Sequence, residues 1–342
     1  MRTTVFLLFS TLTAVSAANA TWSWVTVNGV DLTPTFDNAN VVSQPNVASI
    51  KDCSAIAANN QMLYATLGQD KVCKTYDLTY TYKLANGVTS AARYNSDDYE
   101  CFGNADLQGD DTFDSNTRFD RCLDSCKNLF DSTTNQRCNA VTWIQQPGES
   151  MGRCYFKFLK SPLREPTSND RGAISCRSRS SVLQALGVVK VDGIAFAQAG
   201  SVQRTPKVAS VQDCAKIVAQ SGRYANYESS SKVCAVLDVS YKYSLSPSST
   251  GLVKYNTSDY VCSGNADFFG EDIWDTSMRF DRCLDTCKDS SSSTSQQPCN
   301  AVTWVATEGQ DMGRCYLKYL HGDRPAGPNA LGAISCKKSP LN

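Results

Sequence analysis

The spacing of sixteen cysteines constrains this chain more than any other feature. Seven of them recur 161 residues further on, from the pair Cys53 and Cys214 to the pair Cys154 and Cys315. The final pair, Cys176 and Cys336, is separated by 160 residues, so the copies differ by one residue in the last loop. Each copy has the size of a domain, whereas the units of a solenoid recur at about 20–50 residues. The chain is therefore a tandem duplication, and the copies join near residues 178–181.

The N-terminus predicts a secretory signal peptide at residues 1–20. Met1 and Arg2 precede the apolar run from Val5 to Phe9, and small residues lead to Ala20. A basic start, a short apolar run and a small-residue end are typical of such peptides, and this run is too short to span a bilayer. No later segment reaches about 18 uninterrupted apolar residues, so no membrane span is expected. We expect a secreted, extracellular protein whose even number of cysteines forms disulfides.

Charge and residue types disfavour several functional classes. The formal net charge is zero, which disfavours nucleic acid as the main partner. His321 is the only histidine, and it lies in a Gly- and Pro-rich loop. Catalysis of the Ser-His-Asp or Cys-His type needs a partnered histidine, so we expect no enzyme. Zinc and other cofactors are likewise not expected, because secretion favours disulfides over thiolate ligands.

The second half of each copy predicts one helix on a small antiparallel sheet. Phe119, Cys122, Leu123, Cys126 and Phe130 follow helical spacing, and Ser115 or Asn116 is suited to cap the helix. The two cysteines project from one face, better placed to join the helix to a sheet than to pair together. Strand-like runs follow at residues 138–144 and 154–159, and another closes the unit at 172–176.

These residues resemble the PAN/Apple family over residues 101–176 and 262–336. The motifs, in order, are Cys101, Gly103-Asn104-Ala105-Asp106 with Gly109-Asp110-Asp111, Cys122 with Cys126, Cys138-Asn139-Ala140-Val141-Thr142-Trp143, Gly152-Arg153-Cys154-Tyr155-Phe156-Lys157 and Cys176. The resemblance implies the nested disulfides Cys101–Cys176, Cys122–Cys154, Cys126–Cys138, Cys262–Cys336, Cys283–Cys315 and Cys287–Cys299. It also implies binding of proteins or carbohydrates, as in the cellulose-binding elicitor lectins, although no separate cellulose-binding segment is evident.

The first half of each copy reads as a helix followed by strands. Ser49 and Ser210 each precede an acidic residue by three positions, which predicts capped helices. Strand-like runs follow at 72–76 and 233–237, so one cysteine on a helix and one on a strand predict Cys53–Cys73 and Cys214–Cys234. This pattern resembles the centre of a PAN domain with a single disulfide. The expected organisation is α+β, with degenerate PAN-like halves at 21–100 and 180–261 and PAN/Apple domains at 101–179 and 262–342.

Charged and aromatic residues that recur around the second-half helices are the candidate ligand contacts. They are Asp106, Asp111, Arg118, Arg121, Arg153, Asp267, Asp272, Trp274, Arg279, Arg282 and Arg314. For the carboxylates, turn formation and helix capping, calcium binding and ligand contact are all open, although the EF-hand spacing is not met. For the arginines, local ion pairing and ligand contact are both open.

The aromatic residues have two interpretations. Trp143 and Trp304 are expected in the core because each lies in a strand close to a cysteine. Phe113 and Trp274 occupy matching positions in an expected loop before the helix. The tyrosine-rich runs, which contain Tyr80, Tyr82, Tyr241 and Tyr243, are suited to one exposed aromatic face or to a small core.

The sequence therefore favours a non-enzymatic binding protein. Carbohydrate on a cell wall or cell surface is the first ligand class, and an extracellular protein partner is the alternative. Two copies allow bivalent binding, which raises avidity when both sites are engaged. Asn256-Thr257-Ser258 is an N-glycosylation sequon, whereas the matching Asn95-Ser96-Asp97 is not.

Overall fold

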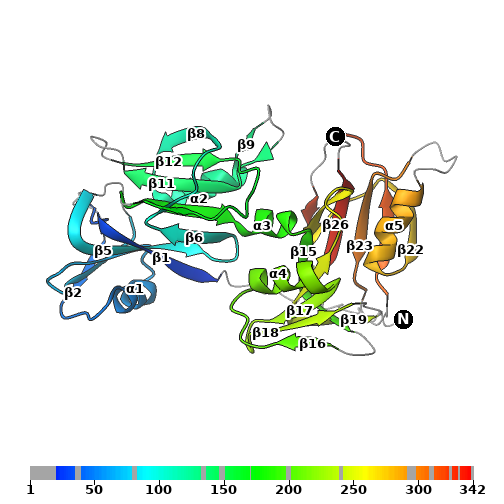
Figure 1. Cartoon of the computed structure of the whole chain (residues 1–342), viewed down its shortest axis with the longest axis horizontal. Coiled ribbons are helices and arrows are strands. Elements are labelled where there is room, and N and C mark those ends of the chain that lie inside the picture. Colours follow the sequence, from blue (N-terminus) through cyan, green and yellow to red (C-terminus); the bar gives the residue numbers. More distant parts are fainter. Residues whose placement is uncertain are drawn as a thin grey trace, which may run out of the picture.

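The computed structural model describes residues 21–34, 40–78, 83–131, 136–145, 151–169, 171–197, 202–238, 242–290, 298–307, 312–322, 326–329 and 332–339. The expected signal peptide and Tyr80, Tyr82 and Tyr241 lie outside these ranges. Within them the protein is α+β, as predicted: five helices accompany four five-stranded antiparallel sheets and three two-stranded ones. Figure 1 shows the two copies side by side, with helix α3 between them.

The first copy contains two of the five-stranded sheets. The first-half sheet has the order β1-β5-β3-β4-β2 and comprises β1 (Trp22–Asp31), β2 (Val41–Gln44), β3 (Tyr64–Leu67), β4 (Cys73–Tyr76) and β5 (Lys83–Asn95), with helix α1 (Ile50–Asn59). The second-half sheet has the order β6-β14-β11-β12-β8 and comprises β6 (Tyr99–Gly103), β8 (Asp111–Asn116), β11 (Ala140–Gln145), β12 (Gly152–Lys157) and β14 (Ile174–Ser178), with helix α2 (Phe119–Asn128). Two short pairs complete the copy: β7 (Ala105–Asp106) with β13 (Thr167–Ser168), and β9 (Phe130–Asp131) with β10 (Gln136–Arg137).

The second copy repeats this arrangement after α3 (Arg179–Ala185). Its first-half sheet has the order β15-β19-β17-β18-β16 and comprises β15 (Val188–Ala197), β16 (Gln203–Thr205), β17 (Tyr224–Glu228), β18 (Val233–Leu237) and β19 (Lys242–Lys254), with α4 (Val211–Ser221). Its second-half sheet has the order β20-β26-β23-β24-β22 and comprises β20 (Tyr260–Gly264), β22 (Asp272–Ser277), β23 (Ala301–Val305), β24 (Arg314–Lys318) and β26 (Ala333–Lys338), with α5 (Phe280–Ser290). The short pair is β21 (Ala266–Asp267) with β25 (Gly327–Pro328).

All four halves share one topology. Each runs through two strands, a helix and three more strands, and its sheet is ordered first, fifth, third, fourth and second. The first halves therefore do not have an unrelated fold, the result that would have contradicted their resemblance to the second halves. The described residues contain four versions of one unit, arranged as two pairs.

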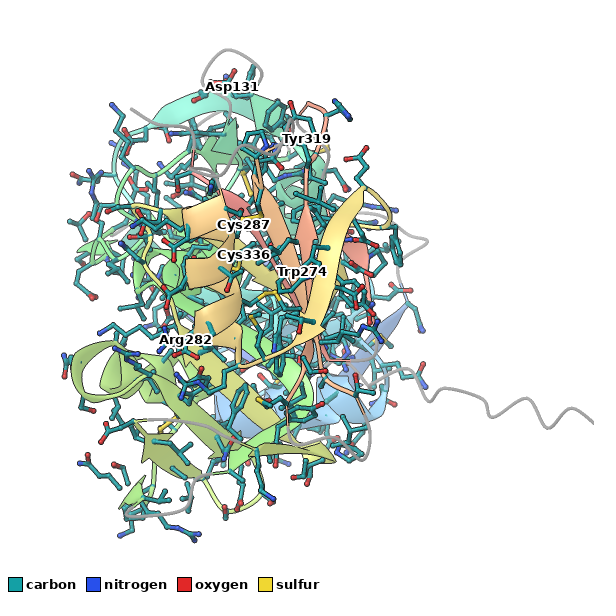
Figure 2. All side chains as sticks on the ribbon, turned by 90° about the vertical axis from the view of Figure 1, so that its right-hand side faces the viewer. Asp131, Trp274, Arg282, Cys287, Tyr319 and Cys336 are labelled. Carbon is teal, nitrogen blue, oxygen red and sulfur yellow. A yellow bond between two sulfur atoms is a disulfide. The ribbon has the colours of Figure 1, made fainter. Side chains whose placement is uncertain are left out.

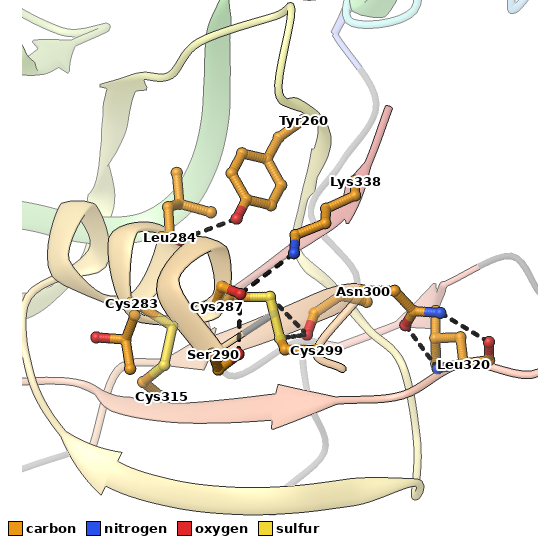
Figure 3. The surroundings of a disulfide bond; sticks show 12 residues. Tyr260, Cys283, Leu284, Cys287, Ser290, Cys299, Asn300, Cys315, Leu320 and Lys338 are labelled. Atoms are coloured by element: carbon orange, nitrogen blue, oxygen red, sulfur yellow. Dashed lines mark hydrogen bonds between the residues drawn. A yellow bond between two sulfur atoms is a disulfide. The ribbon is translucent and has the colours of Figure 1, made fainter. Parts of the chain in front are cut away.

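Eight disulfides join the cysteines in the eight expected pairs. Cys283–Cys315 and Cys287–Cys299 connect α5 to its sheet and to the chain before β23. Figure 3 shows both disulfides in close-up, and Figure 2 shows Cys287 on α5. The single disulfide of the first half, Cys53–Cys73, joins α1 to β4. It occupies the same topological position as the α2–β12 disulfide.

The helix starts agree with the sequence in the first halves and differ in the second. The Ser49 and Ser210 side chains accept hydrogen bonds from the backbone N–H groups of Asp52 and Asp213, which confirms the caps. Ser115 and Asn116 do not cap α2: they lie in β8, paired with β12, and the N-cap is Arg118 without a side-chain cap. Phe130 was expected in the helix, but the helix ends at Asn128 and Phe130 begins β9.

In each copy the second-half helix packs between two sheets. One core cluster contains Val25, Tyr64 and Tyr76 from the first-half sheet together with Phe119 of α2 and Trp143 of β11. A second cluster repeats this set in the other copy, with Leu237 in the position of Tyr76. The half-sheets therefore share a core within a copy, and the two faces of the second-half sheet differ: one contacts the helix and the other points away from it.

Candidate functional site

The face of the second-half sheet that points away from its helix carries a set of polar side chains that recurs in both copies. Along β12, Cys154 and Phe156 belong to the core shared with α2. Because successive side chains of a strand alternate, Arg153, Tyr155 and Lys157 point to the opposite face. We call these three residues, with Asp111 and Asp114 of the neighbouring β8, the outer-face row. Its counterpart in the second copy comprises Arg314, Tyr316, Lys318, Asp272 and Asp275.

A buried lysine lies at one end of each row. Only 2% of the Lys157 side chain is exposed; its ammonium contacts the carboxylate of Asp111 and lies 3.7 Å from Asp106 Oδ1. Lys318 donates to Asp272 Oδ1 at 2.5 Å and to the Gly270 carbonyl at 3.0 Å. A charge taken out of water is retained only when it is paired and hydrogen-bonded, and both ammonium groups meet this condition. Their carboxylate partners are close to half exposed, so negative charge reaches the surface.

A tyrosine ring lies at the centre of each row. The Arg153 guanidinium donates to Asp114 Oδ2 at 2.5 Å and lies 5.8 Å from the centre of the half-buried Tyr155 ring. In the second copy Arg314 bonds Asp275 and lies 5.7 Å from the Tyr316 ring. The hydrogen bond to Asp275 raises the pKa of Arg314. Each row thus presents an aromatic ring between fixed positive and negative groups.

A hydroxyl pair lies beside each row. In the first copy Thr142 Oγ1 lies 2.6 Å from Ser175 Oγ and donates to Asp106 Oδ1 at 2.8 Å. In the second copy Thr303 Oγ1 lies 2.7 Å from Ser335 Oγ and accepts the backbone N–H of Phe268 at 3.3 Å. Asp267 Oδ1, the counterpart of Asp106 Oδ1, is buried and has no hydrogen-bond partner among the described residues.

The structure brings together some of the predicted contact residues and separates others. Asp106, Asp111 and Arg153 lie around the first row, and Asp267, Asp272 and Arg314 around the second. The other predicted arginines lie on the helix side of the sheets: Arg121 and Arg282 are exposed on α2 and α5, and Arg118 and Arg279 precede these helices. Tyr155 and Lys157 belong to the motif that carries the family resemblance, but the sequence did not indicate them as contact residues, although the Cys-Tyr-x-Lys pattern recurs in both copies.

Arg118 and Arg279 contribute to the contact between half-sheets. Arg118 binds the Asp120 carboxylate through two nitrogens, at 3.0 and 2.7 Å, and Tyr64 of the first-half sheet donates to Asp120 Oδ1 at 2.9 Å. Tyr224, Arg279 and Asp281 repeat this arrangement. Burial and the negative charge of the carboxylate raise the pKa of both tyrosines.

The tryptophans divide between core and surface. Trp143 and Trp304 are buried, as expected, and their indole N–H groups donate to the carbonyls of Thr117 and Met278. Trp274 is 49% exposed and lies on β22, an edge strand beside α5, as labelled in Figure 2. The expectation that Trp274 and Phe113 lie in loops was wrong, because both residues belong to edge strands paired in register with β24 and β12.

A separate cavity of about 230 Å³ opens on the first-half sheet of the second copy. It is lined by Phe196, Ala197, Val202, Arg204, Asn226, Glu228, Val233, Ala235 and Leu237. No residue of this cavity was a candidate from the sequence, because the first halves of the two copies match mainly in pattern. A position-by-position comparison of the paired strands would have indicated it.

The described residues lack both a metal-binding cluster and a membrane-spanning helix. They contain no cluster of three or more His, Cys, Asp or Glu side chains arranged to hold a metal ion. No helix in them has the length and apolar character needed to cross a membrane.

Comparison with known proteins does not identify a relative. No protein-family model matches the chain, and no curated protein matches it significantly.

Proposed function

We propose that this chain is a secreted, non-enzymatic protein of the PAN/Apple type that binds carbohydrate through its two outer-face rows. The observation that carries the proposal is the repetition of the row: a half-buried tyrosine lies beside an Asp-bound arginine in both copies. The eight disulfides favour an extracellular setting, and the signal peptide predicted at residues 1–20 agrees with it.

The chemistry of each row suits a sugar. A pyranose has an apolar face that stacks on an aromatic ring and hydroxyls that pair with charged side chains. In each row a tyrosine offers the ring, and the neighbouring arginine and two aspartates offer donors and acceptors. Their ion pairs hold these groups in place before a ligand arrives, which lowers the entropy lost on binding.

A glycan array and a cellulose pull-down test the proposal on the full mature chain. We expect retention on one class of glycan, weakened at least tenfold by Tyr155→Ala with Tyr316→Ala. Phe130→Ala is the control, because Phe130 is also an exposed aromatic residue but lies outside both rows. Absence of any glycan signal, or equal retention by the double variant, would reject the carbohydrate assignment.

A protein partner is the second candidate, and one observation favours it. Phe269, Ile273 and Trp274 are 53%, 40% and 49% exposed, and all three lie on or just before edge strand β22. Exposed apolar side chains beside an unpaired strand edge are typical of protein contacts. Capture of an extracellular protein by the wild type, with loss of capture in Trp274→Ser, would support this function instead.

A further inference from the structure

The cavity on the first-half sheet of the second copy has no equivalent chemistry in the first copy. The strand registers align the two sheets: Arg204, Ala235, Asn226 and Gly251 form one row across the second. The corresponding row in the first copy is Ser43, Lys74, Thr66 and Ser90. Leu237 likewise stands where Tyr76 lies. Relative to the first copy, the second has smaller side chains at two positions, Ala235 in place of Lys74 and Leu237 in place of Tyr76. It also has an arginine, Arg204, in place of Ser43.

In the first copy, the larger side chains fill this part of the sheet. Tyr76 is fully buried, and its hydroxyl contacts Thr66 Oγ1, which lies 2.8 Å from Ser90 Oγ. In the second copy, Asn226 replaces Thr66. Its amide oxygen accepts the backbone N–H of Phe196 at 2.7 Å, and its amide nitrogen donates to the Phe196 carbonyl at 2.6 Å. These two hydrogen bonds hold Phe196 in the wall of the cavity, and they occupy both the oxygen and the nitrogen of the Asn226 amide.

The cavity combines an apolar floor with two charged groups. Ala235, Leu237 and Phe196 supply apolar surface, whereas Arg204 and Glu228 are exposed at its edge. Among the described residues, neither of these two side chains takes part in an ion pair; Glu228 accepts only a hydrogen bond from Ser231 Oγ, at 2.8 Å. A guanidinium binds a carboxylate through two parallel hydrogen bonds. A carboxylate such as Glu228 accepts hydrogen bonds from hydroxyls.

The size of the cavity limits the ligand to a small molecule. Clefts for drug-sized ligands measure about 300–1,000 Å³, so a cavity of about 230 Å³ suits a single ring. The ligand needs an apolar face, a carboxylate for Arg204 and a hydroxyl for Glu228. A hexuronate, the acidic form of a hexose, carries all three features.

We propose that this cavity binds one hexuronate residue of an acidic glycan, with its carboxylate on Arg204 and a hydroxyl on Glu228. The inference rests on the proposed carbohydrate function but assigns a different site, present in one copy only. The outer-face rows would then bind the remainder of the glycan or a separate one.

Titration of the full mature chain with glucuronate and galacturonate tests the inference, using calorimetry or ligand-observed NMR. Glucose and galactose are the neutral controls, and benzoate is a carboxylate without hydroxyls. We expect one uronate site per chain, weakened at least tenfold by Arg204→Ser and by Ala235→Lys, which restore the residues of the first copy. Arg137→Ser, which removes an exposed charge on β10 of the first copy, should leave binding unchanged.

Each other outcome overturns the inference in a distinct way. Uronate binding that survives Arg204→Ser, or no uronate binding at all, would reject the site, and equal binding of benzoate would reject the sugar assignment. If Ala235→Lys fails to fold, Arg204→Ser still decides, because Arg204 is exposed on an edge strand. Glycan retention that depends on Tyr155 and Tyr316 but not on Arg204 would reject this site while leaving the proposed function intact.

Discussion

At the scale of single residues, the least expected feature is the buried lysine of each outer-face row. Lys157 and Lys318 are 2% and 3% exposed, yet each ends a strand on the face away from the helix. Lysine is almost never fully buried unless it is paired. Their partners, Asp111 and Asp272, belong to edge strands, so each lysine adds a second ion pair between the edge strand and its neighbour, beside the pair made by Arg153 or Arg314.

Removing the carboxylate should therefore cost more than removing the lysine. Asp111→Ala leaves the ammonium with Asp106 at 3.7 Å as its remaining ion-pair partner among the described residues. We expect a loss of about 1–3 kcal/mol in the free energy of unfolding, the cost of leaving a buried donor without its hydrogen-bond acceptor. Lys157→Met replaces the buried charge by an apolar chain of similar length and should cost about 1 kcal/mol or less. Urea denaturation measures both values. Asp114→Ala is the control, since its more exposed pair with Arg153 should contribute less than about 1 kcal/mol; a larger loss in Lys157→Met than in Asp111→Ala would contradict the argument.

Asn256 offers a residue-scale test of the extracellular assignment. Its side chain is exposed in the turn between β19 and β20, where its amide nitrogen donates to Asp259 Oδ2 at 2.9 Å. The sequon is therefore accessible on the surface. Protein secreted from a eukaryotic host should lose mass on enzymatic deglycosylation, and Asn256→Gln should show no such shift. An unmodified Asn256 in secreted material would remove this support for a glycoprotein.

Local sequence signals predicted the residues of the fold unevenly. Ser49 and Ser210 cap helices as expected, because a cap depends on only four consecutive residues. Ser115 has the same local character, but it pairs with Cys154 in a strand instead. All six residues of β8 are exposed, so no apolar alternation marked it as a strand. Its partner, β12, is distant in sequence, and this long-range pairing places Ser115 in a strand and not at the start of the helix.

At the scale of elements, the position of the disulfides explains how a degenerate half retains the fold. The first half keeps only the helix-to-strand crosslink, Cys53–Cys73, whereas the second half has three. Closing a loop of this size contributes about 2–4 kcal/mol by restricting the unfolded chain. The first-half sheet also packs on α2 of its neighbour, so apolar burial at this contact compensates for the missing crosslinks.

The same contact should make the protein sensitive to alkaline pH. Tyr64 and Tyr224 are buried where a first-half sheet meets a second-half helix, and burial raises the pKa of both above the unfolded value of about 10. Their contribution to stability is fully present below pH 10 and is lost as pH rises above it, since the unfolded chain releases these protons first.

Melting temperature and tyrosinate absorbance between pH 8 and 11 test this expectation. The melting temperature should fall above about pH 10, and Tyr64→Phe should reduce the slope of that decrease. Return to pH 8 should restore the original melting curve, which controls for disulfide exchange. A melting temperature that stays constant up to pH 11 would show that these tyrosines do not govern the half-to-half contact.

The candidate sites were harder to predict than the elements, for a physical reason. The sequence indicated that Asp106, Asp111 and Arg153 belong near one another, because they recur in both copies. It did not indicate that these residues lie on the opposite side of the sheet from Arg118. That side is set by the alternation of side chains along β12 and by the placement of α2. The cavity beside Arg204 arises from loss of volume at Ala235 and Leu237, and such a change has no local motif.

At the scale of the whole molecule, the two copies are connected by a packed helix and not by an extended linker. Arg179 at the start of α3 bonds the Asp98 and Tyr99 carbonyls of the first copy, at 2.8 and 2.9 Å. Val182 and Leu183 are buried, and Leu183 belongs to the core around α4 of the second copy. The polar stretch near 178–181, where the copies were expected to join, thus contains the start of α3 and is not an extended linker.

Although the copies touch through α3, their apolar cores remain separate, so we expect them to unfold as two units. Every hydrophobic cluster among the described residues draws its members from one copy, and Leu183 of α3 belongs to a cluster of the second. Leu183→Ala should therefore destabilise the second copy by about 2–3 kcal/mol while leaving the first unchanged. Hydrogen exchange resolved by peptide measures each copy in the same sample. Leu123→Ala in α2 is the matched control, and its effect should be confined to the first copy. Equal loss of protection in both copies from either variant would show that the contact through α3 couples them into one cooperative unit, because separate cores alone cannot transmit the change.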